Sequence, residues 1–352
     1  MSIQEIFSRN HLRWFRLRSS LTASNIHSPE HGCPIEFWRG VDGRRELCVP
    51  HLSYLEALVV GALQGVTELF PVSSLGHSIL IPALVGGQWS RDLDVSAPES
   101  PYLAFIVGLH VATALALLVF FWRDWVAIVR GLITSIRYRH IVEPNERLAW
   151  ILVAATIPVG VAGLALDHLF RTTLGKPVPA AVFLAVNGVV LYGAERLRRR
   201  TNAMTAADAP GAAASSNLLT TADVRISRIP LARGVMIGSA QVLALLPGIS
   251  RSGVTMAAGL LRGLSHEDAA RFSFLLATPV ILAAGMLKIP ELFGPQGTGI
   301  GAQVLVGSLA SFVSAYVAVR FLTRYFETRT LTPFAIYCLI AGIGSLLWLT
   351  VR

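Results

Sequence analysis

The chain has 352 residues, of which 53% are hydrophobic and only 14% are charged, and its mean hydropathy is +0.58. A soluble domain carries about 25% charged residues, so this composition excludes an ordinary soluble protein and favours a polytopic membrane protein. A net charge of +9 would suit a nucleic-acid partner. We exclude that partner, because the basic residues cluster between apolar segments, where the positive-inside rule expects them.

Residues 1–50 differ from the rest of the chain. They are polar, rich in arginine and without helical periodicity, and they lack the apolar run of a signal peptide. We interpret them as an N-terminal extension that is either disordered or an artefact of too early a start codon, with Val49 as the alternative start. A regulatory tail is the functional alternative. The three cysteines, Cys33, Cys48 and Cys338, have no metal-ligand spacing.

Residues 51–352 are predicted to form the membrane domain. Two apolar blocks, Tyr54–Leu84 and Ile229–Leu261, are interrupted by glycine, proline and serine. Each block is followed by three apolar segments close to the roughly 20 residues that cross a bilayer. The six predicted spans are Tyr102–Trp122, Leu148–Leu166, Ala180–Ala194, Ala269–Ile289, Ile300–Phe321 and Leu331–Val351. The arginine-rich and then low-complexity stretch 196–228 is predicted to be a flexible linker.

The two interrupted blocks are related by a shift of 177 residues without a gap. The shift places Gly61 on Gly238, Gln64 on Gln241, Ser73 on Ser250, and Gly76 on Gly253. It indicates a duplication, with repeat one at 52–195 and repeat two at 229–352. Because each half has an odd number of spans, the second half is inverted. The predicted fold is therefore an all-α polytopic membrane protein with an inverted-topology repeat, each half a re-entrant helical hairpin plus three transmembrane helices.

The charged connections predict an orientation. Arginine is abundant in the connections 123–147, 196–233 and 320–329, which are therefore expected on the cytoplasmic side. The acidic loop 85–100 is expected outside. The first hairpin then opens outward, the second opens inward, and their tips meet near the middle of the membrane.

Polar residues gather at both breaks. The first break carries Gln64, Glu68, Ser73, Ser74 and His77, and the second carries Ser250, Arg251, Ser252 and Thr255. Ionisable side chains at membrane depth are costly and usually mark function. Glycine and serine allow tight turns that expose N–H groups and direct positive helix ends toward the tips. These features predict an anion site, and a phosphate suits it best.

Several roles are open to these residues. Arg251 is predicted to hold phosphate oxygens and stabilise the charge that develops during transfer. Ser250, Ser252 and Thr255 are expected to add hydrogen bonds. Either Ser73 or Ser74 is a nucleophile or only a phosphate ligand, and His77 is a general base or acid. Glu68 is a base, a group that orients His77, or a ligand of a divalent cation on the pyrophosphate.

Structural alternatives stand beside these roles. A serine in a membrane helix commonly bonds the backbone, and an arginine at a helix end commonly extends to the interface. We interpret His110, inside an uninterrupted span, as a packing or helix-contact residue. Gln64 and Gln241 are expected to bond to each other across the contact between the two halves.

At these breaks the sequence resembles the undecaprenyl-diphosphatase family, the bacitracin-resistance type of bacterial membrane phosphatase. The motif QGVTELFPVSSLGH at 64–77 carries the resemblance, together with LPGISRSGVT at 246–255 and RFSFLL at 271–276. The similarity runs from about residue 52 to the C-terminus and does not cover 1–50. Both motifs are long and nearly complete, so the resemblance is specific.

The resemblance implies two re-entrant hairpins, six spanning helices and a place in the bacterial plasma membrane with the site reached from the outer face. It implies hydrolysis of undecaprenyl diphosphate to undecaprenyl phosphate and inorganic phosphate, which recycles the cell-wall lipid carrier. A divalent cation, Mg²⁺ or Ca²⁺, is the implied cofactor. Bacitracin is expected to compete for the lipid substrate, and a homodimer stays open.

The functional residues of the family map onto Glu68, Ser73, Ser74, His77, Ser250, Arg251 and Thr255. Many members have glutamate where this chain has Gln64. A neutral amide binds a cation more weakly than a carboxylate, so this difference puts a metal-binding role for position 64 in doubt.

Two other functions remain as alternatives. A transporter or flippase of a polyprenyl phosphate lipid is the first, because inverted repeats with broken helices suit alternating access. An ion channel or structural membrane protein is the second. The pair of Glu68 and His77 favours hydrolysis, because anion transport does not need it. Whether Ser74, His77 or water attacks phosphorus stays open at this point.

Overall fold

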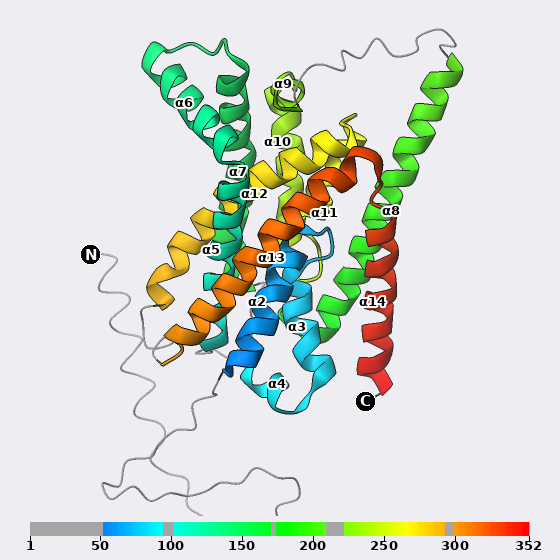
Figure 1. Cartoon of the computed structure of the whole chain (residues 1–352). Helices are drawn as coiled ribbons and strands as arrows, with labels where there is room; N and C mark the ends of the chain where they lie inside the picture. Colours follow the sequence, from blue (N-terminus) through cyan, green and yellow to red (C-terminus); the bar gives the residue numbers. More distant parts are fainter. Residues whose placement is uncertain (1–51, 94–100, 170–173, 209–221, 293–298, 352) are drawn as a thin grey trace, which may run out of the picture. The chain divides into compact units, whose positions relative to one another are not determined.

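The computed structural model describes residues 52–93, 101–169, 174–208, 222–292 and 299–351, and all regular structure in these ranges is helical (Figure 1). The predicted polar extension 1–50 lies outside the described residues, and so does most of the low-complexity part of the linker, 209–221.

The first interrupted block forms two short helices. Helix α2 (Tyr54–Leu69) begins with a capping box, in which Ser53 Oγ accepts a bond from Glu56 N at 3.2 Å and the Glu56 carboxylate accepts one from Ser53 N at 2.8 Å. The helix ends at Phe70, where the backbone turns extended, and α3 (Ser74–Val85) begins four residues later. The short α4 (Gly87–Asp92) follows. The break motif thus lies on the connection between α2 and α3.

The second interrupted block follows the same plan. Helix α10 (Leu231–Ser239) tightens into the 3₁₀ segment η2 (Ala240–Leu245), and α11 (Arg251–Leu261) begins after a turn at Gly248, whose φ is +109°. Such a φ favours glycine. Ser73 and Ser250 cap the two returning helices alike, because each hydroxyl accepts a bond at 3.2 Å from the N–H three residues on, that of Gly76 or Gly253.

Five helices among the described residues are long and apolar enough to cross a membrane. They lie within α7 (Pro144–Leu169), α8 (Pro177–Asp208), α12 (His266–Leu292), α13 (Gly301–Thr328) and α14 (Thr332–Val351). A sixth is reached if α5 (Pro101–Phe120) and α6 (Trp122–Tyr138), which bend by 87° at their junction, count as one span. The chain is therefore a multi-pass membrane protein with helices at all six predicted spans.

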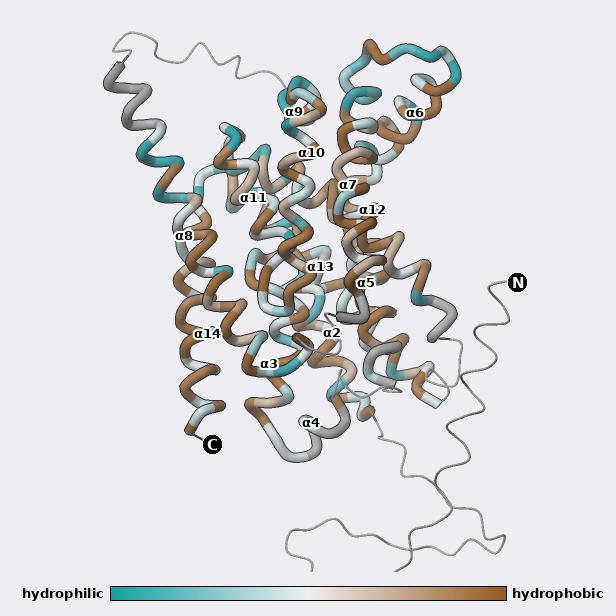
Figure 2. The backbone as a smooth tube through the Cα atoms, turned by 180° about the vertical axis from the view of Figure 1, so that it is seen from behind, coloured by the Kyte–Doolittle hydropathy of each residue, from teal (hydrophilic) through white to brown (hydrophobic). Residues whose placement is uncertain are grey.

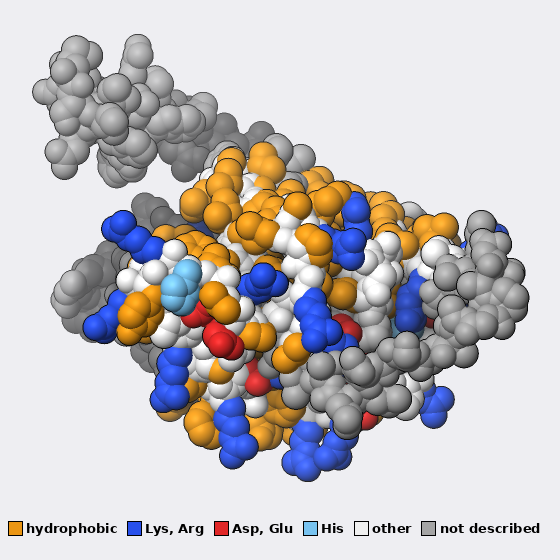
Figure 3. Space-filling view, turned by 90° about the horizontal axis from the view of Figure 1, so that it is seen from above, with side chains coloured by type: hydrophobic (Ala, Val, Ile, Leu, Met, Phe, Trp, Pro, Cys, Tyr) orange, Lys and Arg blue, Asp and Glu red, His pale blue; other side chains and the backbone are white. Residues whose placement is uncertain are grey.

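The helical surfaces agree with a lipid environment. Large apolar side chains such as Leu164, Leu305 and Ile340 are exposed on the long helices, and Figure 2 shows these helices as mainly hydrophobic. The hydrophilic colour gathers at the loop after α6, on the part of α8 just before its grey end, and on α9 (Ala222–Ser227). Figure 3 views this end and shows Lys and Arg side chains spread over it. The arginine-rich connections thus share one end, and α4 lies at the other (Figure 1).

Small residues bring α2 close to α13. A Cβ added to Gly61 would collide with the backbone of Gly307, and one added to Gly65 would collide with Ser311 and Ser314. Close backbone approach through small residues is the usual means of helix association in membranes. This contact holds α2, which carries the break motif, against a spanning helix.

We expect Gly61→Leu to destabilise the protein by about 3 kcal/mol or more, because neither backbone can yield to the new side chain. The measurement is thermal unfolding of the purified protein in detergent. The control is Gly160→Leu on α7, where an added Cβ meets nothing within 4 Å. Equal melting temperatures for the two variants would contradict the close packing of α2 and α13.

Candidate active site

The two helical connections touch each other. A Cβ added to Gly76 would lie 3.0 Å from Gly248 Cα, and one added to Gly253 would lie 3.3 Å from Pro71 Cβ. Glycines at 76 and 253 therefore allow the tip of each hairpin to approach the other. Residues separated by more than 170 positions in sequence are brought together at this point.

Asn187 of α8 links the two tips. Its side chain is fully buried; Nδ2 donates to Pro71 O at 3.0 Å, and Oδ1 accepts from Ser250 N at 3.1 Å. It thereby satisfies one backbone group of each connection where no helical partner exists. Unpaired backbone groups are costly in a membrane interior, so this side chain stabilises both breaks at once.

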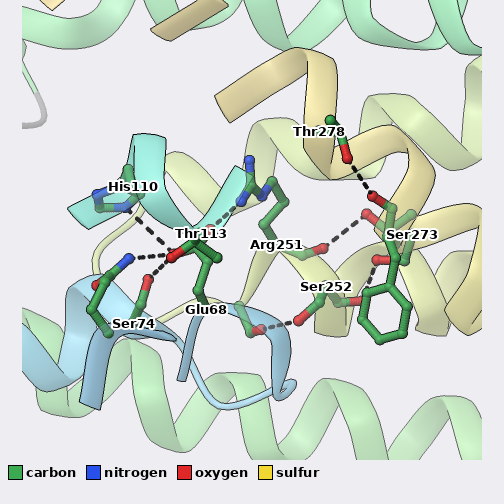
Figure 4. A network of polar contacts seen from close by, with 12 residues as sticks. Glu68, Ser74, His110, Thr113, Arg251, Ser252, Ser273 and Thr278 are labelled. Atoms are coloured by element: carbon green, nitrogen blue, oxygen red, sulfur yellow. Dashed lines mark hydrogen bonds and ion pairs between the residues drawn. The ribbon is translucent and has the colours of Figure 1, made fainter. Parts of the chain in front are cut away.

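The carboxylate of Glu68 is the centre of the site (Figure 4). Its Oε2 accepts a bond from Gln64 Nε2 at 2.9 Å and a short bond from the Ser74 hydroxyl. Its Oε1 forms an ion pair with Arg251 Nη2. His110 Nε2 of α5 lies 3.4 Å from Oε2. Four helices, α2, α3, α5 and α11, therefore contribute to one buried carboxylate.

His77 is not part of this cluster. Its Nδ1 is 2.7 Å from Ser73 O, and its Nε2 is 2.8 Å from the hydroxyl of Tyr337 on α14. Since a carbonyl only accepts, Nδ1 carries the proton and Nε2 accepts from Tyr337. The expectation that Glu68 orients His77 is therefore not met, because both ring nitrogens have other partners.

Four predicted phosphate ligands bond the backbone in this structure. Ser73 and Ser250 cap helices, Ser252 Oγ donates to Phe70 O at 3.2 Å, and Thr255 Oγ1 donates to Arg251 O at 2.8 Å. Ser250 and Ser252 still lie at the tip of the second hairpin, with hydroxyls 3.1 Å apart. Thr255 faces its own helix, as a serine or threonine in a membrane helix commonly does.

The two glutamines do not meet. Gln64 bonds Glu68, whereas Gln241 Nε2 donates to Gly238 O of its own segment at 3.2 Å. The expected bond between them was wrong, because each finds a closer partner on its own hairpin. Gln64 Oε1 is a buried acceptor with no hydrogen-bond partner among the described residues.

The oxygen donors of Glu68 and Gln64 are too few to hold a divalent cation without further ligands. The described residues contain no group of three or more His, Cys, Asp or Glu that could hold a metal ion. Glu68 offers one carboxylate, already bonded to cationic and neutral donors, and Gln64 offers one amide oxygen. These residues do not form a cage for a resident cation. They fit a cation held by one carboxylate and by substrate phosphates, which is a common mode for Mg²⁺.

An apolar pocket of about 920 Å³ lies beside the first hairpin. Residues of α2, α3 and α14 supply most of its wall, among them Leu63, Leu80, Leu84, Phe334 and Trp348. His77 and Tyr337 are polar members of the lining. The pocket therefore combines a surface suited to a hydrocarbon chain with a histidine from the break motif.

Three residues of this arrangement, His110, Asn187 and Tyr337, are not recognisable as site residues from the sequence pattern. His110 was interpreted as a packing residue, although an ionisable group inside a span is itself a functional signal. Asn187 lies in another span and gave no motif, and Tyr337 ends the stretch PFAIY at 333–337, which resembles the family but received no predicted role. Only the packing of α5, α8 and α14 around the hairpins brings these three to the site.

Comparison with known proteins agrees with the break motifs. The family described as bacitracin resistance protein BacA matches residues 57–344. This chain belongs to that family. Curated relatives named undecaprenyl-diphosphatase include one from Mycolicibacterium paratuberculosis, 70% identical over 86% of this chain and 99% of its own length. A relative from Frankia casuarinae, named undecaprenyl-diphosphatase 1, is 50% identical over 82% of this chain and 96% of its own length. Another from Granulibacter bethesdensis, named undecaprenyl-diphosphatase, is 40% identical over 86% of this chain and 98% of its own length.

We expect Asn187→Ala to lower stability by about 2–4 kcal/mol, since it leaves buried groups of both tips without this partner, at about 1–3 kcal/mol each. Thermal unfolding in detergent measures the loss. Thr278→Val is the matched control, because Thr278 is also buried but its hydroxyl donates to Phe274 O at 3.2 Å within its own helix. A smaller loss for Asn187→Ala than for Thr278→Val would contradict the linking role.

Proposed function

We propose that this BacA-family protein hydrolyses undecaprenyl diphosphate to undecaprenyl phosphate and inorganic phosphate. Its curated relatives bear the name undecaprenyl-diphosphatase at up to 70% identity over most of the chain. The observation that carries the chemistry is the meeting of Glu68, Ser74 and Arg251 at the contact of the two hairpins. A nucleophile, a base and a phosphate-binding cation are the groups that phosphoryl transfer needs.

Ser74 is the proposed nucleophile. Its hydroxyl donates to Glu68, so the carboxylate is placed to take the proton as Ser74 Oγ attacks the terminal phosphorus. The bond from phosphorus to the bridging oxygen breaks, and undecaprenyl phosphate leaves. Water then cleaves the phosphoserine and releases inorganic phosphate. His77 lies away from Glu68, which argues against its attack as part of this cluster.

Arg251 is the proposed phosphate-binding group. It stands at the first residue of α11, where the positive helix end adds to its charge. In this structure its guanidinium is paired with Glu68, so a substrate phosphate must take the place of that carboxylate. This exchange of partners would release Glu68 to accept the proton of Ser74.

The apolar pocket supports a lipid substrate. Its wall of leucine, phenylalanine and tryptophan side chains fits a prenyl chain, and it begins beside the first break motif. His77 and Tyr337 lie on this wall, where they can contact the phosphate end of the lipid or the leaving oxygen. A free sugar phosphate has no hydrocarbon chain that could occupy this apolar pocket.

The inverted-topology repeat is part of the proposal. It is supported by the 177-residue shift, by the equivalent caps at Ser73 and Ser250, and by the contacts of α2 with α13 and α10 with α7. We place the arginine-rich end on the cytoplasmic side of the bacterial plasma membrane. The first hairpin then opens to the outer face, from which the substrate enters.

A divalent cation is proposed to arrive on the pyrophosphate, with Glu68 and the Gln64 amide oxygen as its protein ligands. Mg²⁺ or Ca²⁺ bound there would neutralise part of the phosphate charge. Bacitracin is expected to act by competing for the lipid, and a homodimer remains compatible with the exposed apolar helices. Neither is needed for the arrangement of Glu68, Ser74 and Arg251.

The first test is phosphate release from undecaprenyl diphosphate by the purified protein in detergent with Mg²⁺ or Ca²⁺. We expect Arg251→Ala to lower kcat/KM at least about 100-fold, the usual cost of losing a donor to transition-state charge. Arg262→Ala, at the other end of the same helix and exposed, is the control and should keep wild-type activity. Lipid translocation in liposomes without phosphate release would support the flippase alternative instead.

The second test concerns the nucleophile. Ser74→Ala is expected to lower kcat by about 1000-fold or more while the protein stays folded, as loss of a nucleophile does elsewhere. Ser73→Ala removes a helix cap and should cost mainly about 1 kcal/mol of stability. Lipid labelled at its terminal phosphate is mixed with the protein, and the reaction is quenched in acid. The label should remain on the wild-type protein and not on Ser74→Ala. Labelling that survives Ser74→Ala would exclude Ser74 as the nucleophile.

A further inference from the structure

His110 occupies a position in the site that its place in the sequence did not suggest. It lies in the middle of α5, and its Nε2 is 3.4 Å from Glu68 Oε2. Its Nδ1 is 2.9 Å from Ile106 O, one turn earlier in the same helix. In Figure 4 the ring points toward Glu68 from the side opposite Arg251. Glu68 thus lies between the imidazole of His110 on α5 and the guanidinium of Arg251 on α11.

Both partners of the His110 ring are hydrogen-bond acceptors. A backbone carbonyl and a carboxylate both only accept hydrogen bonds, so each ring nitrogen must carry a hydrogen to bond its partner. The ring of His110 therefore presents one nitrogen to each of two acceptors, Ile106 O and Glu68 Oε2. His77 differs, because one of its nitrogens faces a carbonyl and the other faces the Tyr337 hydroxyl, which can donate. His110 therefore faces two acceptors, whereas His77 faces one acceptor and one hydroxyl that can donate.

The contact with His110 also matters when Arg251 exchanges Glu68 for a substrate phosphate. When a substrate phosphate draws Arg251 away, the buried carboxylate of Glu68 loses its ion pair with that guanidinium, which is unfavourable. His110 still contacts Glu68 Oε2, the same oxygen that accepts from Ser74. The carboxylate then keeps its direction toward Ser74 during the reaction.

We propose that His110 is a positioning residue of the phosphatase reaction, donating its Nε2–H to Glu68 so that this carboxylate stays aimed at Ser74 while Arg251 binds phosphate. The role rests on the proposed function and adds a residue from α5 to a site otherwise built from the two hairpins. It assigns His110 no direct contact with the reacting atoms.

The kinetic test uses three variants of the full-length protein in detergent with undecaprenyl diphosphate. His110→Ala removes the donor and should lower kcat at least about tenfold, with KM changed much less, because a misplaced base slows the chemical step. His110→Gln keeps an N–H donor at a similar reach and should recover most of kcat. Thr113→Val is the control, since Thr113 is one turn further along α5 and bonds Ser311 of α13 at 3.0 Å; its kcat should stay near wild type.

Wild-type kcat in His110→Ala would overturn the proposal. Equal losses in the Gln and Ala variants would also overturn it, because they would show that N–H donation is not what matters. A loss in Thr113→Val as large as in His110→Ala would assign the effect to packing of α5.

A stability cycle tests the contact without any activity. Melting temperatures of His110→Ala, Glu68→Gln and the double variant are compared with wild type. Coupled residues should lose less in the double variant than the sum of the single losses. Additive losses would overturn the contact. If the wild type releases no phosphate from undecaprenyl diphosphate, the proposed function fails while this cycle still decides whether His110 holds Glu68.

Discussion

The carboxylate of Glu68 sets the demands that the surrounding structure meets. A charge buried in a membrane protein must find donors within the protein, because lipid offers none. Gln64 and Ser74 donate to it, Arg251 pairs with it, and the His110 ring contacts it, from four different helices. Two of these donors, Ser74 and Arg251, are the proposed nucleophile and phosphate-binding group. Satisfying Glu68 and assembling a site for a phosphate are therefore one structural problem.

The backbone at the two tips poses a second demand. Helices that stop inside the protein leave N–H and C=O groups without partners. Ser73 and Ser250 answer this within each hairpin by capping the returning helix, and Asn187 answers it between the hairpins. Glycines at the tips then let the two connections touch. Because the tips are bonded to each other, Arg251 on one lies within reach of Glu68 on the other.

The two histidines divide the site into different regions. His110 belongs to the charged cluster around Glu68, whereas His77 and Tyr337 form part of the apolar pocket. A lipid pyrophosphate needs both regions, one for its phosphates and one for its chain. In the proposed mechanism Glu68 takes the proton of Ser74, and His77 lies on the lipid side. The motif in which Glu68 and His77 are only nine positions apart does not reveal this division.

The sequence by itself determined the membrane class, the two interrupted blocks and the residues Glu68, Ser74 and Arg251, because hydropathy and polar residues at membrane depth are local signals. The 177-residue shift also paired Ser73 with Ser250, and the structure shows that both cap helices. Only the tertiary structure decided which side chains meet. Gln64 bonds Glu68 and not Gln241, and His77 bonds Tyr337. His110 and Asn187 contact the site from spans that carry no motif. Those contacts depend on how the helices rotate and pack, and no local pattern in the chain encodes that geometry.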